Sequence, residues 1–316
     1  MLIDEAAQDL VTGIVNTALG EAPMRVSRFP TGLRHFVYDV DLRNGPSVVV
    51  RLSRTEDRGV CRSAAALSRQ LRPLGVPLPG LIADGSDADV PFLILERLAG
   101  SDLGAVERRL DVAGLDRIAG RVAAAQAIVA KLPQVGRYGY AARSEHGPFA
   151  RWPQVLDGYL ARTRARMTPL DDDAAEVLET CAALLVRFRL DLDALPPTPF
   201  LHDTTTKNVI VTEDGQFSGI VDVDDLCYGD PRLVAALTLA ALSRGASEGR
   251  RTEYVTLWMR HAGWADDGVF RLYVALCLAD FMSELGHSFN GNLAPTSPGE
   301  RATLKRLFDQ AVRVAG

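Results

Sequence analysis

The segment from Phe200 to Asp225 interrupts a long helical region with two short stretches of strand character. These stretches, Asn208–Thr212 and Phe217–Asp222, flank the turn residues Glu213–Gly215. Apolar residues bounded by a turn of this kind predict a β-hairpin. Polar residues stand at both outer ends of the hairpin, and loops held on a rigid scaffold often carry function. The sequence therefore predicts a site at the mouth of a helical lobe.

The remainder of the chain after Ser101 has apolar residues at a spacing near 3.6, which predicts helices. The expected helices are Asp116–Leu132, Phe149–Met167, Asp171–Leu190, Pro231–Arg244, Glu253–Ala262, Val269–Leu285 and Pro298–Val314.

The first hundred residues instead have strand character. Expected strands are Phe36–Leu42, Ser47–Leu52, Gly80–Asp84 and Pro91–Leu98, with one helix at Arg58–Leu74. Strands with a single helix among them predict a small α+β lobe. We therefore expect an α+β protein with an N-terminal lobe at residues 1–98 and a helical C-terminal lobe at residues 99–316.

Length and charge agree with a two-lobed globular protein. The 316 residues exceed the usual size of a single core. Asp and Glu number 40 against 35 Lys and Arg, a net charge of −5, which argues against a nucleic-acid partner because phosphate binding needs a basic face. The mildly acidic balance would suit a cationic ligand, although it is equally a solubility feature.

The cysteine pattern and the length of the apolar stretches indicate in which cellular compartment the protein is expected. The four cysteines form no CxxC pair, so they read as buried thiols of a reducing cytoplasm rather than as a zinc site. No segment has the roughly 20 consecutive apolar residues that span a bilayer. The N-terminus lacks the pattern of a signal peptide. We expect a cytoplasmic protein with no membrane partner, and the sequence does not determine its oligomeric state.

Three polar residues of the hairpin segment are suited to phosphoryl transfer. Asp203 and Asn208 stand five positions apart in FLHDTTTKNVIV, and Asp222 ends the second expected strand. Phosphoryl transfer needs a carboxylate that accepts the proton of the attacking hydroxyl and hard oxygen ligands that hold Mg²⁺ on the nucleotide phosphates. The alternative is that these residues are ordinary turn acids beside a hairpin.

The same stretch resembles the aminoglycoside phosphotransferase family, relatives of protein kinases that phosphorylate small molecules. The family pattern HGDxxxxN, a hairpin and IDWExxxxGDP appears here as LHDTTTKN and VDVDDLCYGDP. The resemblance implies a protein-kinase-like two-lobed fold. It assigns the catalytic base to Asp203 and the Mg²⁺ ligands to Asn208 and Asp222.

In the N-terminal lobe the resemblance implies a nucleotide site. Gly32 in FPTGLRHFVYDV corresponds to the phosphate loop, and Arg51 stands where the family has a Lys or Arg that binds the phosphates. Backbone groups around PFLILERLAG, at Glu96, Arg97 and Leu98, would bind the adenine edge. An ordinary turn explains Gly32 nearly as well, and Arg51 could be a solvated charge at the end of a strand.

The chain departs from the family pattern at three places, one of which is Val223, where the family usually has an aromatic residue. Leu201 replaces the family histidine, with His202 at the glycine position. The helix after Arg51 also lacks the glutamate that usually pairs with the basic residue. We expect either that Glu56 or Asp57 supplies the partner or that Arg51 is positioned differently.

Three further residues each have two interpretations. Asp230 before Pro231 reads best as a structural cap of the next helix. For Asp224, the two interpretations are a secondary metal contact and an ordinary loop acid, and the sequence favours neither. Lys207 is either a contact to the transferred phosphate or a solvated lysine.

The sequence thus predicts an enzyme that transfers phosphate from ATP or GTP to a hydroxyl of a small molecule such as an aminoglycoside, a macrolide or another metabolite. Its partners would be the nucleoside triphosphate with Mg²⁺ and the hydroxyl acceptor. The alternative is a pseudokinase that binds nucleotide or a partner protein without transferring phosphate, which the missing helix glutamate would permit. A metal-dependent hydrolase is disfavoured because the segment lacks the histidines that such sites recruit.

Overall fold

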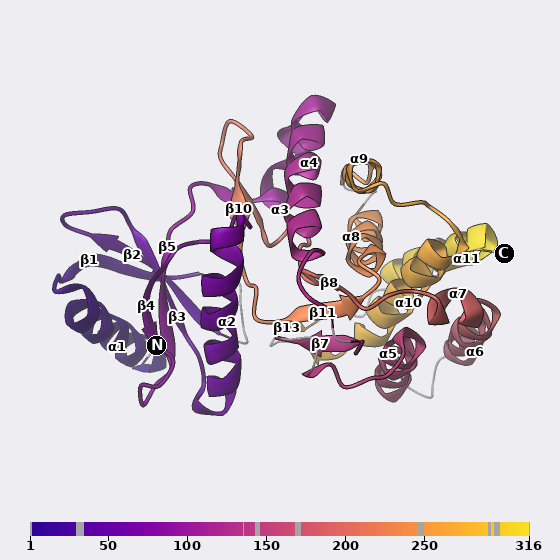
Figure 1. Cartoon of the computed structure of the whole chain (residues 1–316), viewed down its shortest axis with the longest axis horizontal. Helices are drawn as coiled ribbons and strands as arrows, with labels where there is room; N and C mark the ends of the chain where they lie inside the picture. Colours follow the sequence, from indigo (N-terminus) through magenta and orange to yellow (C-terminus); the bar gives the residue numbers. More distant parts are fainter. Residues whose placement is uncertain are drawn as a thin grey trace. The chain divides into compact units, whose positions relative to one another are not determined.

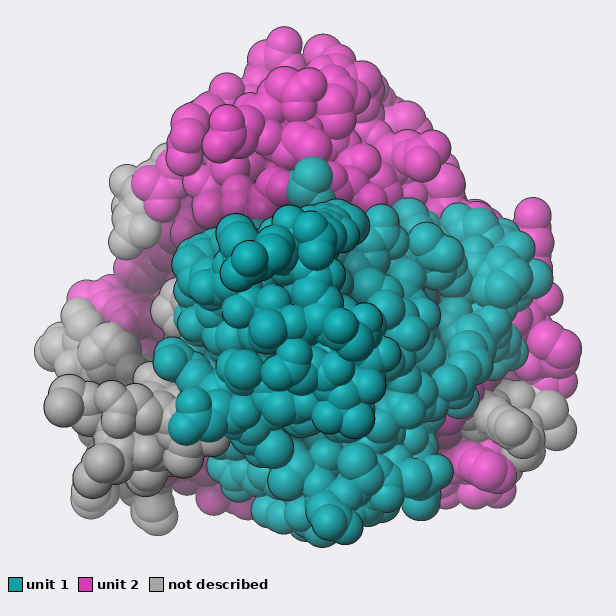
Figure 2. All heavy atoms as spheres, turned by 90° about the vertical axis from the view of Figure 1, so that its left-hand side faces the viewer, with its two compact units in different colours: residues 1–99, 219–224 teal, residues 100–218, 225–316 magenta. Residues whose placement is uncertain are grey.

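The structure is a computed structural model that describes residues 2–29, 35–134, 136–142, 146–167, 172–245, 250–289, 292–293 and 298–315. The chain divides into two compact units, coloured separately in Figure 2. Unit 1 comprises residues 1–99 and 219–224, and unit 2 comprises residues 100–218 and 225–316.

Unit 1 is built on a five-stranded antiparallel sheet with the strand order β1-β2-β3-β5-β4 (Figure 1). Its strands are β1 (Pro23–Arg28), β2 (Phe36–Leu42), β3 (Val48–Leu52), β4 (Leu81–Gly85) and β5 (Phe92–Glu96). Its helices are α1 (Leu2–Leu19) and α2 (Arg58–Leu71), the latter continued by a 3-10 turn at Arg72–Leu74.

The two helices of unit 1 pack on opposite faces of this sheet. Val11 and Val15 of α1 join the apolar cluster that contains Val50 and Ile94. Cys61 and the alanines of α2 pack against Leu93 and the partly buried Leu95. Because successive side chains of a strand point to opposite faces, Leu93 and Ile94 must belong to different faces. Arg51, next to Val50, therefore lies on the face that α2 covers.

Unit 2 is mainly helical (Figure 1). Its helices are α3 (Leu103–Val106), α4 (Val112–Val129), α5 (Trp152–Arg166), α6 (Asp172–Arg187), α7 (Arg189–Asp193), α8 (Arg232–Arg244), α9 (Glu253–Ala262), α10 (Gly268–Glu284) and α11 (Pro298–Ala315). Helix α10 is the centre of the core, with twelve buried residues of the seventeen in the helix. None of the helices, over the ranges the structure describes, is long and apolar enough to cross a membrane.

Small sheets complete unit 2. One has the order β10-β9-β6, from β6 (Ser101–Asp102), β9 (Val209–Val211) and β10 (Phe217–Ile220), the last of which runs on into unit 1. A second has the order β7-β11-β8, from β7 (Gly139–Ala141), β8 (Thr198–Phe200) and β11 (Leu226–Gly229). A two-residue pair, β12 (Ser288–Phe289) and β13 (Asn292–Leu293), is the third.

The predicted hairpin is confirmed, with one change at its end. Strands β9 and β10 are neighbours, and Gly215 in the turn between them has a φ of 76°, a conformation that glycine adopts without steric cost. The second strand stops at Ile220 rather than at the predicted Asp222. Asp222 has a φ of 62°, which is incompatible with an extended strand.

Residues 219–224 belong to unit 1 because they pack against its loop after α2. The amide of Ile220 donates to the carbonyl of Pro77 at 2.8 Å. A Cβ at Gly219 would lie 2.6 Å from the same carbonyl oxygen, so only glycine allows the approach. This attachment fixes the backbone that leads to Asp222.

Most of the predicted elements are present. Strand β2 and helix α9 have the predicted bounds, and the other expected helices differ from the structure by a few residues at their ends. The expected Asp171–Leu190 helix ends earlier, at Arg187, and α7 follows it. All four cysteines are buried and free, as predicted. The sequence did not predict helices α1 and α3 or strands β1, β6, β7, β8, β11, β12 and β13.

Candidate active site

Asp203 lies in a loop of unit 2 that its own hydrogen bonds hold in place. The side-chain amide Nδ2 of Asn208 donates to the main-chain oxygen of Asp203 at 2.9 Å. The hydroxyl of Thr205 donates to a carboxylate oxygen of Asp203 at 3.2 Å, and the amide of Asn208 donates to the carbonyl of Thr205. The predicted pair Asp203 and Asn208 is therefore brought together.

A buried glutamine holds the start of this loop. Gln126 of α4 is 3% exposed. Its side-chain oxygen accepts from the amide of Leu201 at 3.0 Å, and its Nε2 donates to the carbonyl of Leu201 at 2.8 Å and to the Thr204 hydroxyl at 3.0 Å. Sequence reasoning missed Gln126. The only local signal was a polar residue on the apolar stripe of an amphipathic helix.

Asp203 also lines a cavity of about 220 Å³ within unit 2. The other lining residues are His202 and a set of aromatic and apolar side chains from β7, β8, α5, α8 and α10. A ligand in this cavity would lie against the Asp203 carboxylate.

Asp222 and Arg51 form an ion pair in unit 1. The distance between Arg51 Nη1 and Asp222 Oδ1 is 3.3 Å, and the Asp222 side chain is half exposed. Asp222 has the only positive φ among the described residues other than glycine. Such conformations cost of order 1–3 kcal/mol and often occur at functional sites.

Asp224 is the stronger partner of Arg51. Nη2 of Arg51 lies 2.5 and 2.6 Å from the two carboxylate oxygens of Asp224. His35 Nε2 lies 3.2 Å from Asp224, and His35 Nδ1 lies 3.1 Å from the hydroxyl of Ser53. Burial alone would raise the pKa of Asp224. The hydrogen bond of His35 and the charge and hydrogen bonds of Arg51 outweigh burial and lower this pKa to about 2.

These contacts correct two sequence-based expectations. The pairing of Arg51 with Glu56 or Asp57 is wrong, because the carboxylates of Asp222 and Asp224 face its guanidinium instead. Arg51 is also no solvated charge, since it is 6% exposed. Although burial opposes the charge of Arg51, the two aspartates raise its pKa. Asp224 is therefore a partner of Arg51, together with Asp222. The sequence suggested no role for His35, which contacts Asp224.

The structure describes two of the three other predicted nucleotide contacts, Glu96 and Leu98. Gly32 lies outside the described residues. Glu96 ends strand β5, and its amide donates to the carbonyl of Gly80 at 2.8 Å. Its carboxylate accepts from the amide of Gly80 and pairs with Arg72. The carbonyl of Leu98 accepts a hydrogen bond from the Arg97 side chain. Their role toward a nucleotide stays a prediction.

Asp230 makes structural contacts at the start of α8, although the N-cap residue is Pro231 rather than Asp230 as predicted. It is 4% exposed, and its carboxylate accepts from the amide of Arg232 at the start of α8 at 3.0 Å. The same carboxylate pairs with the Arg232 guanidinium and accepts from the hydroxyl of Tyr273.

Asn208 in unit 2 and Asp222 in unit 1 each offer an oxygen atom of the kind that binds Mg²⁺. Because Nδ2 of Asn208 is used by the Asp203 carbonyl, its Oδ1 remains as an oxygen donor, and the carboxylate of Asp222 is accessible. Among the described residues no cluster of three or more His, Cys, Asp and Glu side chains forms an all-protein metal site. Magnesium is commonly held by one or two carboxylates plus substrate phosphates, so a carboxylate such as that of Asp222 is chemically suited to it.

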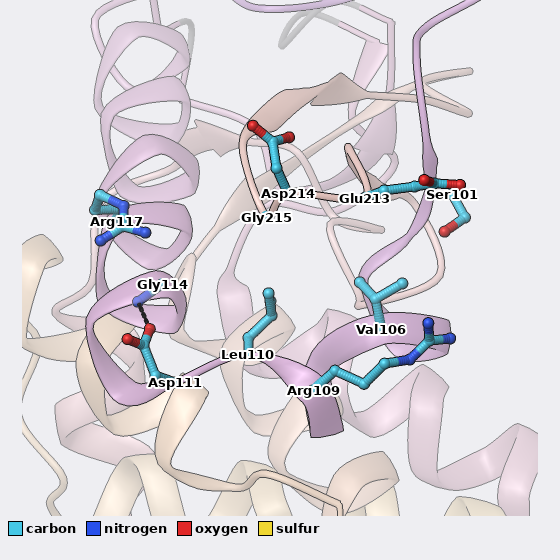
Figure 3. Close-up of a pocket in the computed structure, with 10 residues that line it drawn as sticks. All are labelled: Ser101, Val106, Arg109, Leu110, Asp111, Gly114, Arg117, Glu213, Asp214 and Gly215. Atoms are coloured by element: carbon cyan, nitrogen blue, oxygen red, sulfur yellow. Dashed lines mark hydrogen bonds between the residues drawn. The ribbon is translucent and has the colours of Figure 1, made fainter.

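A larger hollow of about 750 Å³ lies elsewhere in unit 2 (Figure 3). Charged side chains line it, including Arg117 of α4 and Asp214 of the β9–β10 turn. The carboxylate of Asp111 is already bonded to the amide of Gly114 at 2.7 Å (Figure 3). None of the predicted site residues that the structure describes lines this hollow.

Solved structures of aminoglycoside phosphotransferases share the fold of this chain. A thermostable mutant of APH(4)-Ia, in a ternary complex with AMP-PNP and hygromycin B, aligns with a TM-score of 0.68 at 16% identity, over 97% of this chain and 98% of that one. APH(2")-IIia with GDP and kanamycin aligns with a TM-score of 0.66 at 16% identity, over 96% of both chains. The streptomycin–ATP complex of APH(2")-IIa gives a TM-score of 0.61 at 13% identity, over 96% and 95%.

The sequence itself carries the family relationship. No curated protein matches the chain. The sequence model of the phosphotransferase enzyme family, however, matches residues 25–267, a range that contains Arg51, Asp203, Asn208, Asp222 and Asp224. The chain therefore belongs to the phosphotransferase enzyme family.

Proposed function

We propose that the protein transfers the terminal phosphate of ATP or GTP to a hydroxyl group of a small molecule. The observation that carries the proposal is Asp203, held by Asn208, Thr205 and the Gln126-bound loop at the wall of a cavity. A carboxylate fixed beside a ligand-sized cavity is positioned to align a hydroxyl and accept its proton.

In the proposed reaction the acceptor oxygen forms a bond to the terminal phosphorus of the nucleotide. The bond between that phosphorus and the bridging oxygen breaks, and the nucleoside diphosphate leaves. Asp203 accepts the hydroxyl proton. Asn208 and Asp222 would hold Mg²⁺, whose contribution is to neutralise charge on the phosphates. Arg51 would bind phosphate oxygens, and backbone groups of Glu96 and Leu98, with Gly32, would contact the nucleotide.

The contacts of Arg51 weaken the alternative of a binding-only pseudokinase. That alternative depended on the missing acid of α2. Asp224 supplies a carboxylate to Arg51 from another segment, so the basic residue is held without a helix glutamate. The relatives of known structure bind ATP analogues, ATP or GDP, together with aminoglycosides. This supports a nucleotide donor and a small hydroxyl acceptor for this chain.

Transfer of labelled phosphate from ATP and from GTP to pools of hydroxylated compounds tests the proposal. Asp203→Asn should bind nucleotide normally and lower turnover by about 10²- to 10⁴-fold, as expected on loss of a general base. Asp214→Asn, an exposed acid of the neighbouring β-turn, is the matched control and should keep wild-type turnover. Normal turnover by folded Asp203→Asn would refute the catalytic role.

A further inference from the structure

His35 lies directly before strand β2 and beside the end of strand β3. The two strands pair with Phe36 opposite Leu52, which places His35 opposite Ser53. Alternate residues of a strand point to the same face of a sheet, so Ser53 shares the face of Arg51, the face that α2 covers. His35 and Ser53 are both buried. A polar imidazole is therefore enclosed on the same face of the sheet as Arg51.

Both nitrogens of the His35 ring have a partner in unit 1. Nδ1 lies 3.1 Å from the hydroxyl oxygen of Ser53, and Nε2 lies 3.2 Å from Oδ2 of Asp224. The backbone of Ser53 is itself fixed, since its amide donates to the carbonyl of Pro91 at 2.8 Å. Ser53 thus holds one edge of the imidazole while the other edge faces Asp224.

The ring nitrogen that faces Asp224 must be the one that carries a proton. Burial opposes the charge of Asp224, yet the hydrogen bond of His35 and the charge of Arg51 lower its pKa to about 2, so this carboxylate is ionised at neutral pH. An ionised carboxylate only accepts hydrogen bonds. Nε2 of His35 therefore donates to Oδ2 of Asp224, and the bond is charge-assisted.

The two oxygens of Asp224 in turn contact one nitrogen of Arg51. Nη2 of Arg51 lies 2.5 and 2.6 Å from them. One nitrogen bonded to both oxygens leaves the carboxylate free to turn about the line that joins this nitrogen to the carboxyl carbon, and the terminal torsion of an aspartate is broad. The hydrogen bond of His35 to Oδ2 removes this freedom and fixes the plane of the carboxylate.

The same contacts direct the other end of the Arg51 guanidinium. Its Nη1 lies 3.3 Å from Oδ1 of Asp222, whose side chain is half exposed. A guanidinium is planar and rigid, so holding Nη2 also sets the direction of Nη1. Arg51 is buried, and Nη1 is the end of its side chain that faces an accessible carboxylate.

We infer that His35 is a positioning residue for nucleotide binding: through Asp224 it directs Nη1 of Arg51 toward Asp222, the direction from which phosphate oxygens approach. This inference rests on the proposed phosphotransfer, which assigns the nucleotide phosphates to Arg51. It adds a residue that touches neither the nucleotide nor the acceptor. The contact that matters is the one made by Nε2, and the contact of Nδ1 to Ser53 holds the ring.

Two substitutions separate the two nitrogens of His35. The amide nitrogen of glutamine can take the place of Nε2, whereas the amide of asparagine takes the place of Nδ1. His35→Gln therefore keeps a donor for Asp224, and His35→Asn keeps only the contact to Ser53. Calorimetric titration of the full-length protein with ATP or GTP and Mg²⁺ should show a dissociation constant about tenfold higher for His35→Asn, the effect of one hydrogen bond to a charged group. His35→Gln should stay within about threefold of wild type.

Kinetics and unfolding distinguish positioning from a merely structural role. His35→Asn should raise the nucleotide KM about tenfold and leave kcat and the acceptor KM within about threefold of wild type. Urea unfolding reports the stability of each variant. Equal nucleotide affinity of wild type and His35→Asn, or equal losses in His35→Asn and His35→Gln, would overturn the inference. If His35→Asn does not fold, His35→Leu replaces it with the same expected loss.

A double variant tests whether His35 acts through Arg51. Lysine presents one nitrogen instead of a planar fork, so the orientation that His35 imposes no longer matters in Arg51→Lys. His35→Asn should therefore cause no further loss of nucleotide affinity in the Arg51→Lys background. A second tenfold loss there would contradict the inference.

The proposed function fails on a different result. If wild-type protein binds nucleotide but transfers phosphate to no alcohol, the proposed function is wrong, whereas the affinities of the His35 variants are measured without transfer. If transfer proceeds and His35→Asn binds nucleotide as tightly as wild type, only the role of His35 is wrong. If wild-type protein binds neither ATP nor GTP, both are overturned.

Discussion

Arg51 and Asp224, 173 positions apart in the sequence, form a buried ion pair in which one guanidinium nitrogen contacts both carboxylate oxygens. The side chains are 7% and 15% exposed. The pair ties strand β3 to the segment that carries Asp222. Asp224 thus gives Arg51 the carboxylate partner that helix α2, which follows β3, does not supply.

Asp224→Asn should lower the free energy of unfolding by about 3 kcal/mol, because removal of one partner leaves a buried charge poorly compensated. Urea unfolding measures this change. The double variant Arg51→Met, Asp224→Leu should lose less than the sum of the two single variants. Asp41→Asn, which affects the exposed pair with Arg25, is the control and should change stability little. Additive losses in the double variant would contradict the coupling.

Asp222→Asn should remove most of the increase in nucleotide affinity that Mg²⁺ gives wild-type protein, because a charged ligand of the dication is lost. Asn208→Ala should weaken the same increase less. It should also lower turnover, since it deletes the hydrogen bond to the Asp203 carbonyl. Calorimetric titration with and without Mg²⁺ separates the effects. Equal nucleotide affinities of wild type and Asp222→Asn in Mg²⁺ would rule out the metal role.

Gln126→Leu should reduce turnover by roughly 10²-fold, because the loop that positions Asp203 loses its three hydrogen bonds. It should also destabilise the fold by about 1–3 kcal/mol, since the Leu201 backbone groups lose their partner. Gln126→Glu keeps the acceptor for the Leu201 amide and should have a smaller effect. Steady-state kinetics should show the loss in kcat, with the nucleotide KM nearly unchanged. A change confined to the nucleotide KM would contradict this assignment.

Glu284→Gln should stabilise the protein at neutral pH. Burial and Asp280 raise the pKa of Glu284 above 4.5, so ionisation costs the folded state stability as pH rises from 4.5 through the folded-state value. At pH values below 4.5 the carboxyl is protonated in both states, and the variant should match wild type. Thermal unfolding between pH 4 and pH 8 tests this pH dependence. Glu179→Gln, at an exposed position of α6, is the control; an equal gain there would point to a general charge effect.

Local patterns in the sequence predicted the elements whose apolar residues repeat at short range. Strand β2 and helix α9 are examples, since alternation or helical spacing alone defines them. Strand β11 was missed because its four residues are all buried between β7 and β8. A strand buried on both faces lacks alternation, and its partners lie far away in the sequence.

The motif spacing selected Asp203, Asn208 and Asp222 as candidate site residues, but it could not supply their surroundings. The partner of Arg51 was sought nearby, at Glu56 and Asp57, because only local acids are visible in a sequence. The actual contact depends on the packing of Ile220 and Gly219 against Pro77, which brings Asp224 to strand β3. Gln126 escaped notice for the same reason, since its partners Leu201 and Thr204 are more than seventy positions away.

The six residues 219–224 complete a unit whose other residues all precede position 100. A gene fragment that stops at residue 99 would therefore encode strand β3 with Arg51 but neither of its aspartates. Recombination at that point would transfer an arginine without its counter-charges. The first unit of this protein is thus built from two separate segments, and an exchange that stops at residue 99 would leave the acids facing Arg51 to come from the recipient.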